Sequence, residues 1–407
     1  MYARDTVVEV PPFTQQPDGE DVIIGRIETG VFVAVPLEAV ELLEQLAQGK
    51  SVGEVADQYQ QDHGETLDLD DFLSIMEAKG IVRPHVHETG AGEDRPSPRP
   101  RSRYHFSNFP QPLAKFLFSR PVLAASFVVI AMAVAAYARD SSLLRGWRDL
   151  YFTDHRTLSW TILTLAGYVA LFLHELAHLI AARSLGVNSR MGISNRLWYL
   201  VAETDLTGLW SVPKRERYLP MLAGVLLDAV SGAVLVLLLF AYTNKWLSLP
   251  PLWVQLVRAI AFTYVMRLIW QFCLFVRTDL YYVIASFFNC RNLLSDTKGF
   301  LRNLIARVLP LVRPVDQSNI PAAEKRVIRV YSVFLVAGRL WAFSLLLSVT
   351  LPLVVHYAGN LVAAFKAGFS ANPSDFIDAI LLATYFLLPI MVGFTLWIGG
   401  LWRQQRT

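Results

Sequence analysis

Hydrophobic and polar positions divide the chain into a short N-terminal part of mixed character and a long, mostly apolar remainder. Before about residue 85, apolar residues alternate with polar ones or recur at helical spacing. After about residue 120, they form runs long enough to cross roughly 30 Å of hydrocarbon as helices. We expect six such helices, at about 121–138, 158–183, 219–243, 252–276, 331–357 and 378–402. The pattern predicts a mainly α fold, a polytopic membrane helix bundle, with a small α+β domain at its N-terminus.

The N-terminal part has the pattern of strands followed by helices. The runs VIIGRI (Val22–Ile27) and GVFVAV (Gly30–Val35) alternate and meet at the Gly-containing turn ETG, which is typical of a β-hairpin. Apolar residues then recur at helical spacing up to Gly49, which we expect to cap the first helix. The segment SVGE, from Ser51, matches a capping box, in which Ser and Glu side chains satisfy free N–H groups at a helix start. A third helix is predicted at about residues 69–79.

This order of a hairpin, three helices and the apolar exit GIV resembles the PqqD-like peptide-recognition domain, a winged-helix-like fold on enzymes that modify ribosomally made peptides. In that family a leader peptide adds as a strand to the hairpin edge and lies against the last helix. The alternative is an unrelated winged-helix module that binds DNA or another protein, although the acidic helix DLDDFLSIMEAK suits a phosphate backbone poorly. The apolar residues in question are either core residues or, as the resemblance implies, peptide contacts: Val31, Val33, Val35, Phe72, Ile75 and Met76.

A linker and an orientation in the membrane also follow from composition along the chain. The range 86–118 begins with the polar, Pro-rich stretch ETGAGEDRPSPRPRSR, so we expect a flexible linker between a domain at 1–85 and a transmembrane domain at 119–407. His85 and His87 at its start are expected to be solvated rather than to bind a metal. Lys and Arg gather before the first span, between the second and third, between the fourth and fifth, and after the sixth. The positive-inside rule then predicts a multi-pass protein of the cell membrane with both termini in the cytoplasm.

Composition excludes several classes of function. Hydrophobic residues make up 54% of the chain, which is typical of membrane proteins, and the formal net charge of +3 is too small to indicate a nucleic-acid partner. Cys273 and Cys290 lack CxxC spacing and predict neither a disulfide framework nor a thiolate metal site. The N-terminus lacks a basic stretch followed by an apolar one, so we expect no cleaved signal peptide. The sequence contains no Walker loop, dinucleotide fingerprint or nucleophile elbow, which would indicate ATP-driven, redox or serine-hydrolase chemistry.

The second expected span contains LFLHELAHLI, in which three ionisable residues interrupt an apolar helix. His174 and His178 are four residues apart on one helical face, so both imidazoles can reach one metal ion, while Glu175 can hold a water on that ion. Zinc at such a site lowers the pKa of the water and polarises an amide carbonyl. Ionisable groups within a span are costly, which disfavours a chance match. The other alternative is a His-Glu-His proton relay in a transporter.

A catalytic zinc site needs a third protein ligand, and few acidic residues are placed to supply it. Asp279, at the cytoplasmic end of the fourth expected span, lies at the same membrane depth as the histidines and is the best candidate. Asp228 lies within the third span and is expected to be a ligand or a neutral, hydrogen-bonding group in the site. Glu203 and Asp205 belong to a connecting loop and are expected to be solvated or to form turns.

With these residues the region of about 158–290 resembles the catalytic core of site-2 proteases, a family of intramembrane zinc metalloproteases. The sequence departs from the family pattern at Leu280, where Gly is usual, and at Val225 and Asp228, where Pro and Asn are usual. These departures leave the zinc set intact and affect the substrate-binding position. The resemblance implies zinc ligation by His174, His178 and Asp279, general acid–base catalysis by Glu175, and substrate binding by Asp228.

The loop between the second and third spans alternates β-branched and aromatic residues, as in RLWYLV. In site-2 proteases an edge strand here aligns the substrate; the equal alternative is amphipathic structure at the membrane surface. Trp198 and Tyr199 fit the aromatic belt of a membrane interface on either interpretation.

The phrases RTDLYY and RYLPMLAG are closer to a branch of peptide zinc metalloproteases found with peptide-modification systems. This resemblance agrees with that of the N-terminal domain. We therefore expect a zinc-dependent membrane peptidase that hydrolyses a bond in a ribosomally made peptide precursor captured by the N-terminal domain. The alternatives are a non-catalytic membrane protein that binds or exports the peptide, and a site-2 protease that releases a membrane-tethered regulator.

Overall fold

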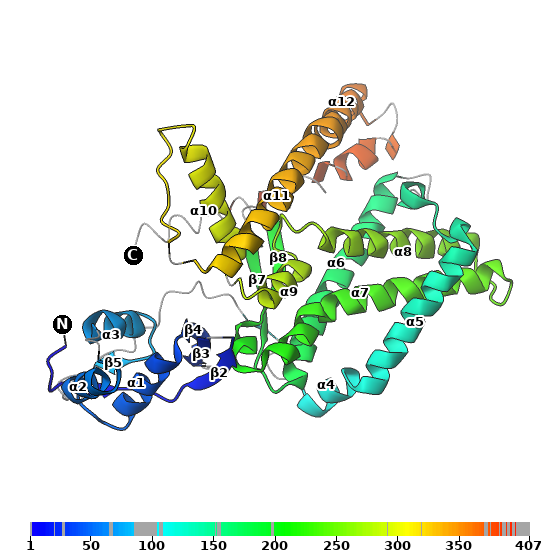
Figure 1. Ribbon diagram of the computed structural model, residues 1–407. Helices are drawn as coiled ribbons and strands as arrows, with labels where there is room; N and C mark the ends of the chain where they lie inside the picture. Colours follow the sequence, from blue (N-terminus) through cyan, green and yellow to red (C-terminus); the bar gives the residue numbers. More distant parts are fainter. Residues whose placement is uncertain are drawn as a thin grey trace.

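The computed structural model describes residues 2–19, 21–26, 29–64, 68–84, 104–105, 109–150, 152, 156–196, 199–290, 292–318, 320–369 and scattered positions between 373 and 395. Within these residues the chain forms a small N-terminal domain and a larger body of long helices (Figure 1). Five of the helices are long and apolar enough to cross a membrane. The chain is thus a mainly α membrane protein that carries a small strand-containing domain, as its hydrophobic pattern predicts.

The N-terminal domain combines a three-stranded antiparallel sheet with three helices. The sheet has the order β2 (Thr14–Asp18), β3 (Asp21–Arg26), β4 (Val31–Val35), so the expected hairpin is confirmed as β3 and β4. Strand β1 (Val8–Glu9) pairs antiparallel with β5 (Arg83–Pro84), which joins the two ends of the domain. The helices are α1 (Leu37–Ala47), α2 (Val52–His63) and α3 (Leu69–Ala78).

Helix boundaries in this domain follow the sequence signals closely. The capping box is confirmed, because the Glu54 carboxylate accepts a hydrogen bond from the Ser51 N–H at 2.8 Å and the Ser51 hydroxyl accepts one from the Glu54 N–H at 3.3 Å. The cap of the first helix differs by one position from the expectation. Gln48 occupies it, and Gly49 follows in the left-handed region with φ +88°, where glycine is the least strained residue.

The helical body is centred on one long helix. Helix α7 packs against three other candidate spans and against the shorter helix α9, with Ala233, Val236 and Leu239 among its buried contacts. The sixth expected span, at about 378–402, lies largely outside the described residues. The five candidate spans coincide with α5 (Arg120–Arg139), α6 (Arg156–Ser184), α7 (Lys214–Thr243), α8 (Pro251–Gln271) and α11 (Ala322–Leu345), the last span continuing to Ser348.

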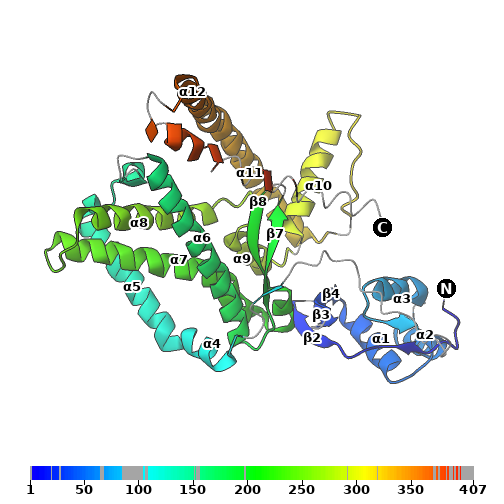
Figure 2. The same ribbon diagram turned by 180° about the vertical axis from the view of Figure 1, so that it is seen from behind.

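Shorter elements fill the segments between these helices. Between α6 and α7, strands β7 (Arg190–Arg196) and β8 (Tyr199–Asp205) form an antiparallel hairpin beside α6 (Figure 2), so this loop contains strands as one of the two interpretations requires. The 3₁₀ turn η3 (Thr207–Ser211) follows them. The remaining helices are α9 (Asp279–Phe287) and α10 (Leu293–Ala306), before α11, and α12 (Leu351–Ala367), after it.

The described part of the range 86–118, for which composition predicts a flexible linker, contains regular structure. Strand β6 (Tyr104–His105) pairs with β7, and helix α4 (Gln111–Leu117) packs against α6. Ala114 of α4 is fully buried, and Arg183 of α6 donates a hydrogen bond to the carbonyl of Phe109 at 3.1 Å. The apolar residues that follow the Arg-rich stretch give α4 a face to bury, so the described part of this range is a strand and a helix rather than a linker.

The capping box gives a testable consequence for the N-terminal domain. Replacing Ser51 with Ala removes the acceptor of the Glu54 N–H and is expected to destabilise the start of α2 by about 1 kcal/mol. The hydrogen-exchange rate of α2 amides in the full-length protein should rise, while the rate of α1 amides should not change. Ser74→Ala is the control, because the Ser74 hydroxyl donates to a helical carbonyl and caps no N–H. Unchanged exchange in α2 after Ser51→Ala would contradict the role of the cap.

Candidate metal centre

One face of α6 meets α7 and carries both histidines. Its residues recur at positions i, i+3, i+4 and i+7 and are all buried: His174, Ala177, His178 and Ala181. Ala177 and Ala181 pack with Ala223 of α7 in one apolar cluster. Small residues at a helix contact let the two backbones approach closely. The imidazoles are therefore held against α7 and do not face lipid.

Gly224 of α7 fits directly against the His174 ring. A Cβ atom added at Gly224 would lie 2.5 Å from Nε2 of His174 and 2.6 Å from two ring carbons. Any side chain at this position would thus force the ring to move. The close approach of the α7 backbone is a condition for the observed position of His174.

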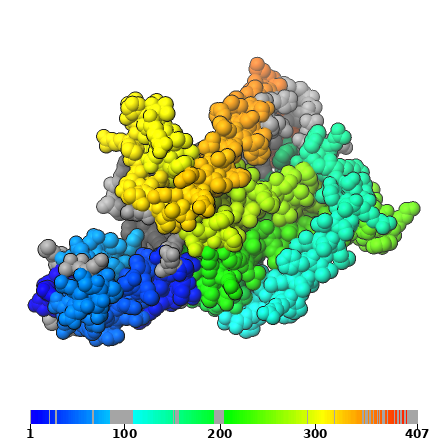
Figure 3. Space-filling model, viewed as in Figure 1, coloured from blue at the N-terminus to red at the C-terminus, as the bar shows by residue number. Residues whose placement is uncertain are grey.

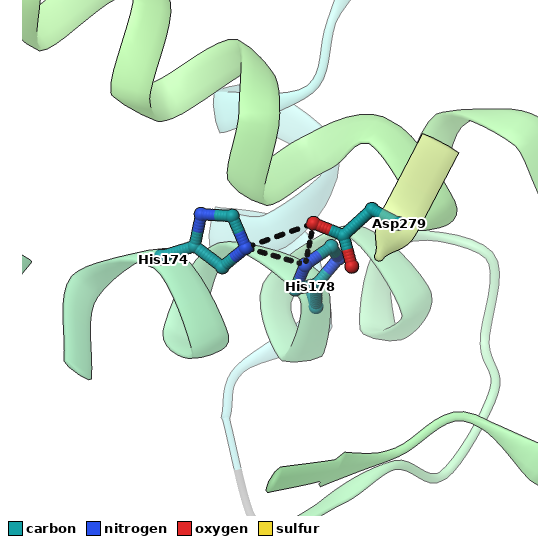
Figure 4. A group of neighbouring side chains, drawn as sticks. All are labelled: His174, His178 and Asp279. Carbon is teal, nitrogen blue, oxygen red and sulfur yellow. Dashed lines mark hydrogen bonds and ion pairs between the residues drawn. The ribbon is translucent and has the colours of Figure 1, made fainter. Parts of the chain in front are cut away.

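Three ligand-type atoms from α6 and α9 converge at this contact (Figure 4). The distances are 3.0 Å between His174 Nε2 and Asp279 Oδ2, 3.2 Å between the two Nε2 atoms, and 3.5 Å between His178 Nε2 and Asp279 Oδ2. Atoms that bind a tetrahedral zinc at 2.0–2.2 Å are separated by about 3.3 Å. The group therefore has the dimensions of a metal site with three protein ligands.

The other ring nitrogens show which tautomers the two histidines adopt. His178 Nδ1 lies 2.7 Å from the carbonyl oxygen of Pro220, which can only accept, so Nδ1 carries the proton. His174 Nδ1 lies 2.9 Å from the carboxylate of Asp228 and donates likewise. Neutral rings then direct both Nε2 lone pairs at each other and at the Asp279 carboxylate. Such a group needs a positive charge at its centre, from a metal ion or from protonation of a ring.

Asp279 is positioned by the start of α9 and the end of α8. It is the first residue of α9, and Thr278 caps that helix by accepting a hydrogen bond from the Tyr281 N–H. Gln271 of α8 donates to Asp279 Oδ2 at 3.1 Å and accepts from its N–H at 3.2 Å. Burial raises the pKa of the Asp279 carboxyl, but an imidazole that is protonated donates its Nε2–H to this carboxylate, and hydrogen bonds of this kind outweigh burial and hold the pKa well below its ordinary value. Asp279 is accordingly an anion in the site.

Asp228 bonds His174 at Nδ1, the ring nitrogen that does not face His178 and Asp279. Its side chain is 3% exposed, and Arg267 of α8 donates to both of its carboxylate oxygens at 3.1 Å. The sequence predicts Asp228 as a ligand or as a hydrogen-bonding group in the site, and the resemblance implies substrate binding. The structure shows the hydrogen-bonding role, because Asp228 lies between His174 and Arg267 with both oxygens bonded to these side chains.

Glu175, the expected general base, is held by strand β8. Its Oε2 accepts hydrogen bonds from the N–H of Thr204 at 3.0 Å and from the Thr204 hydroxyl at 2.8 Å. The same hydroxyl lies 2.9 Å from the main-chain oxygen of Glu175. Within the described part of the chain, Oε1 of Glu175 has no hydrogen-bond partner, which leaves that oxygen available to a water or a substrate.

Sequence reasoning missed four residues that position this group. Arg267 and Gln271 are polar residues four apart within the fourth apolar segment, so the criterion that singled out Asp228 would have found them. Thr204 and Pro220 act wholly or partly through main-chain atoms, and no side-chain pattern marks such a role. Asp205 forms a turn, as expected, because its carboxylate accepts from the N–H and hydroxyl of Thr207.

Four of the six expected peptide contacts in the N-terminal domain lie in or beside its core. Val35 and Met76 are buried there, Val33 and Phe72 pack against it, and Ile75 is exposed; Val31 is half-buried on β4. Within the described residues β4 is an edge strand of the sheet, so its outer side has hydrogen-bonding groups for another strand. His85, His87, Trp198 and the side chains of Tyr199 and Glu203 lie outside the described residues.

Fold and site together define a helical membrane protein with a His-His-Asp group suited to a metal ion, in which both histidines are buried. Comparisons with protein-family models, with curated proteins and with solved structures find no match.

Gly224 provides a test of the contact between α6 and α7. Gly224→Ala is expected to destabilise the protein by about 1–3 kcal/mol, because the added Cβ overlaps the His174 ring. The measurement is thermal unfolding of the purified protein in detergent. Gly167→Ala is the matched control on α6, where an added Cβ meets no neighbour within 4 Å; it should stabilise by about 0.5–1 kcal/mol. Equal melting temperatures for the two variants would contradict the close contact.

Proposed function

We propose that the chain is a zinc-dependent membrane peptidase. The observation that carries this proposal is the convergence of His174 Nε2, His178 Nε2 and Asp279 Oδ2 within ligand distance of one another. Nitrogen and carboxylate donors of this kind match catalytic zinc, which takes three protein ligands and leaves one position open. A structural zinc site would instead use four protein ligands.

His174, His178 and Asp279 would hold the zinc, and Asp228 would keep the His174 ring in its bonding tautomer. Bound zinc supplies Lewis acidity to a peptide carbonyl and activates a water for attack. Arg267 holds Asp228 in place by two hydrogen bonds. Gln271 plays the corresponding part for Asp279.

Glu175 would act as general base and then as general acid. Thr204 anchors one oxygen of its carboxylate and so limits rotation of the side chain, while the second oxygen is free to take a proton from a water. The proton would then pass to the amine that leaves when the peptide bond breaks.

The proposed substrate is a ribosomally made peptide precursor captured by the N-terminal domain, which we propose to be PqqD-like. The edge strand β4, with Val31 and Val33, and helix α3, with Phe72, support this proposal because a peptide strand can add to a free sheet edge beside apolar side chains. The proposed topology keeps both termini in the cytoplasm, the compartment in which such a precursor is made.

Replacing Glu175 with Gln tests the peptidase. The amide cannot accept the proton, so peptide hydrolysis should fall by about 10²–10⁴-fold while zinc stays bound. Hydrolysis is measured by mass spectrometry on a synthetic library of randomised peptides, and zinc by elemental analysis of the purified protein. His178→Ala is the comparison and should lose both zinc and hydrolysis.

Two results would contradict the proposal. Retained hydrolysis in Glu175→Gln would remove the assigned base. A wild-type protein without stoichiometric zinc would favour the rival in which the His, Glu and Asp residues relay protons in a non-catalytic peptide transporter. Cleavage of membrane-tethered proteins but not of library peptides would instead favour a protease that releases regulators.

A second prediction concerns the support of His174. Asp228→Asn should weaken zinc binding by about 10–100-fold, because the ring loses its charged partner. Zinc affinity is measured by competition with a chelating dye. Asp149→Asn is the matched control, since Asp149 is also buried and bonds outside the group, to the N–H of Arg145. Equal affinities in the two variants would show that Asp228 does not orient the ring.

A further inference from the structure

The N-terminal domain touches the helical body at the end of its sheet. Strands β2, β3 and β4 all contact η3, and Figure 3 shows the N-terminal domain directly against the part of the body that contains α7. The turn between β2 and β3 begins at Asp18, whose carboxylate lies 3.3 Å from a guanidinium nitrogen of Arg217 on α7. The exposed fractions of these side chains are 5% and 1%, so the ion pair is buried between the two parts of the chain.

Arg217 is held in place by more than its ion pair. Its Nε donates to the carbonyl of Val212 at 2.9 Å, and the guanidinium lies 4.9 Å from the centre of the Trp210 ring. Removing one partner of a buried pair leaves the other as an uncompensated charge, which is strongly destabilising. The position of the N-terminal domain is therefore linked to Asp18.

A cavity of about 280 Å³ lies beside this contact. Its wall comes from both parts of the chain: Asp18 of the N-terminal domain, Trp210 of η3, Met221 of α7, and Tyr282 and Ser286 of α9. Small-molecule sites usually occupy about 300–1,000 Å³. A cavity of this size suits one or two side chains of a bound polypeptide.

The cavity and the metal centre share one face of α9. Asp279, Tyr282 and Ser286 stand at positions i, i+3 and i+7 of this helix. Seven residues of α helix span about 10 Å. An extended peptide covers that distance in about three residues. A peptide whose bond lies at the metal centre thus has a side chain about three positions away at the cavity.

The lining indicates which side chains the cavity accepts. Trp210, Met221 and Tyr282 offer apolar and aromatic surface. Ser286 is 8% exposed, and its hydroxyl has no hydrogen-bond partner among the described residues. Arg277, Asn289 and Asn292 add polar groups to the wall. Arg277, together with the Arg217 partner of Asp18, disfavours a cationic occupant. The larger part of the lining surface is apolar, so an apolar or aromatic side chain fits it best.

We propose that this cavity is a substrate subsite for an apolar or aromatic side chain about three residues from the cleaved bond, with Asp18 holding the N-terminal domain as its outer wall. The identity of the occupant rests on the proposed peptidase function. The subsite couples the two parts of the chain, because the pocket is complete only while the N-terminal domain is docked.

Cleavage-site profiling with the randomised peptide library tests the subsite in the full-length enzyme. The wild-type enzyme should prefer apolar or aromatic residues by about tenfold at one position about three residues from the cleaved bond. Ser286→Trp fills the cavity and should abolish the preference for large side chains there. Tyr282→Ala enlarges the cavity and should shift the preference towards larger residues. Phe287→Trp is the control, since Phe287 is 65% exposed and does not line the cavity.

The outcomes separate the subsite from the proposed function. Cleavage by the wild-type enzyme with no preference at that position, or with a preference that both cavity variants leave unchanged, overturns the subsite alone. A complete lack of cleavage by the wild-type enzyme overturns the peptidase and with it the peptide as occupant. A preference that moves in opposite directions in the two cavity variants supports the subsite.

Hydrogen exchange tests the docking without any substrate. Asp18→Ala should raise amide exchange in η3 roughly tenfold or more, because Arg217 loses its buried partner. Exchange in α1 and α3 should not change. Asp57→Ala is the matched control, since Asp57 pairs with Arg4 on the exposed surface of the same domain. Unchanged exchange in η3 after Asp18→Ala overturns the role of the ion pair as the holder of the outer wall.

Discussion

Polar groups inside the helical body must find partners within the protein, because a hydrocarbon environment offers none. This constraint explains the arrangement around His174. Its ring bonds Asp228 of α7, which bonds Arg267 of α8, and Asp279 of α9 bonds Gln271 of α8. The hydrogen bonds that satisfy these groups also tie four helices together. The same hydrogen bonds therefore fix both the geometry of the metal centre and the packing of these four helices.

Segments other than the long helices also lie against the site around the His-His-Asp group. Thr204 brings strand β8 to Glu175 with two hydrogen bonds, so a segment outside the spans controls the side chain that we assign as general base. Asp18 of the N-terminal domain bonds Arg217 of α7 and lines one cavity together with the other end of α9. Helix α9 therefore runs from the metal centre to the cavity that the N-terminal domain helps to form.

Much of this arrangement can be predicted from the sequence, and there is a physical reason why the rest cannot. Long apolar runs predict the spans, and the cost of charge in such runs singles out His174 and His178, while Asp279 is predicted from its matching depth at the end of a neighbouring span. Helix α4 was not predicted, because its apolar stretch is short and follows a long Arg-rich segment. The pairing of Asp18 with Arg217 joins residues 199 positions apart, and no local pattern carries such a contact. A main-chain partner such as the Pro220 carbonyl cannot be recognised from the sequence, because every residue type has this group.

The two histidines differ in the kind of atom that holds them. The partner of His174 is a carboxylate, which a single codon change can remove, whereas the partner of His178 is a main-chain carbonyl that every residue type possesses. As long as α7 keeps its path, substitution at position 220 leaves an acceptor in place. Genetic drift can therefore alter the orientation of His174 in small steps, while the orientation of His178 is protected against it. A single substitution can therefore disturb the orientation of His174 more easily than that of His178.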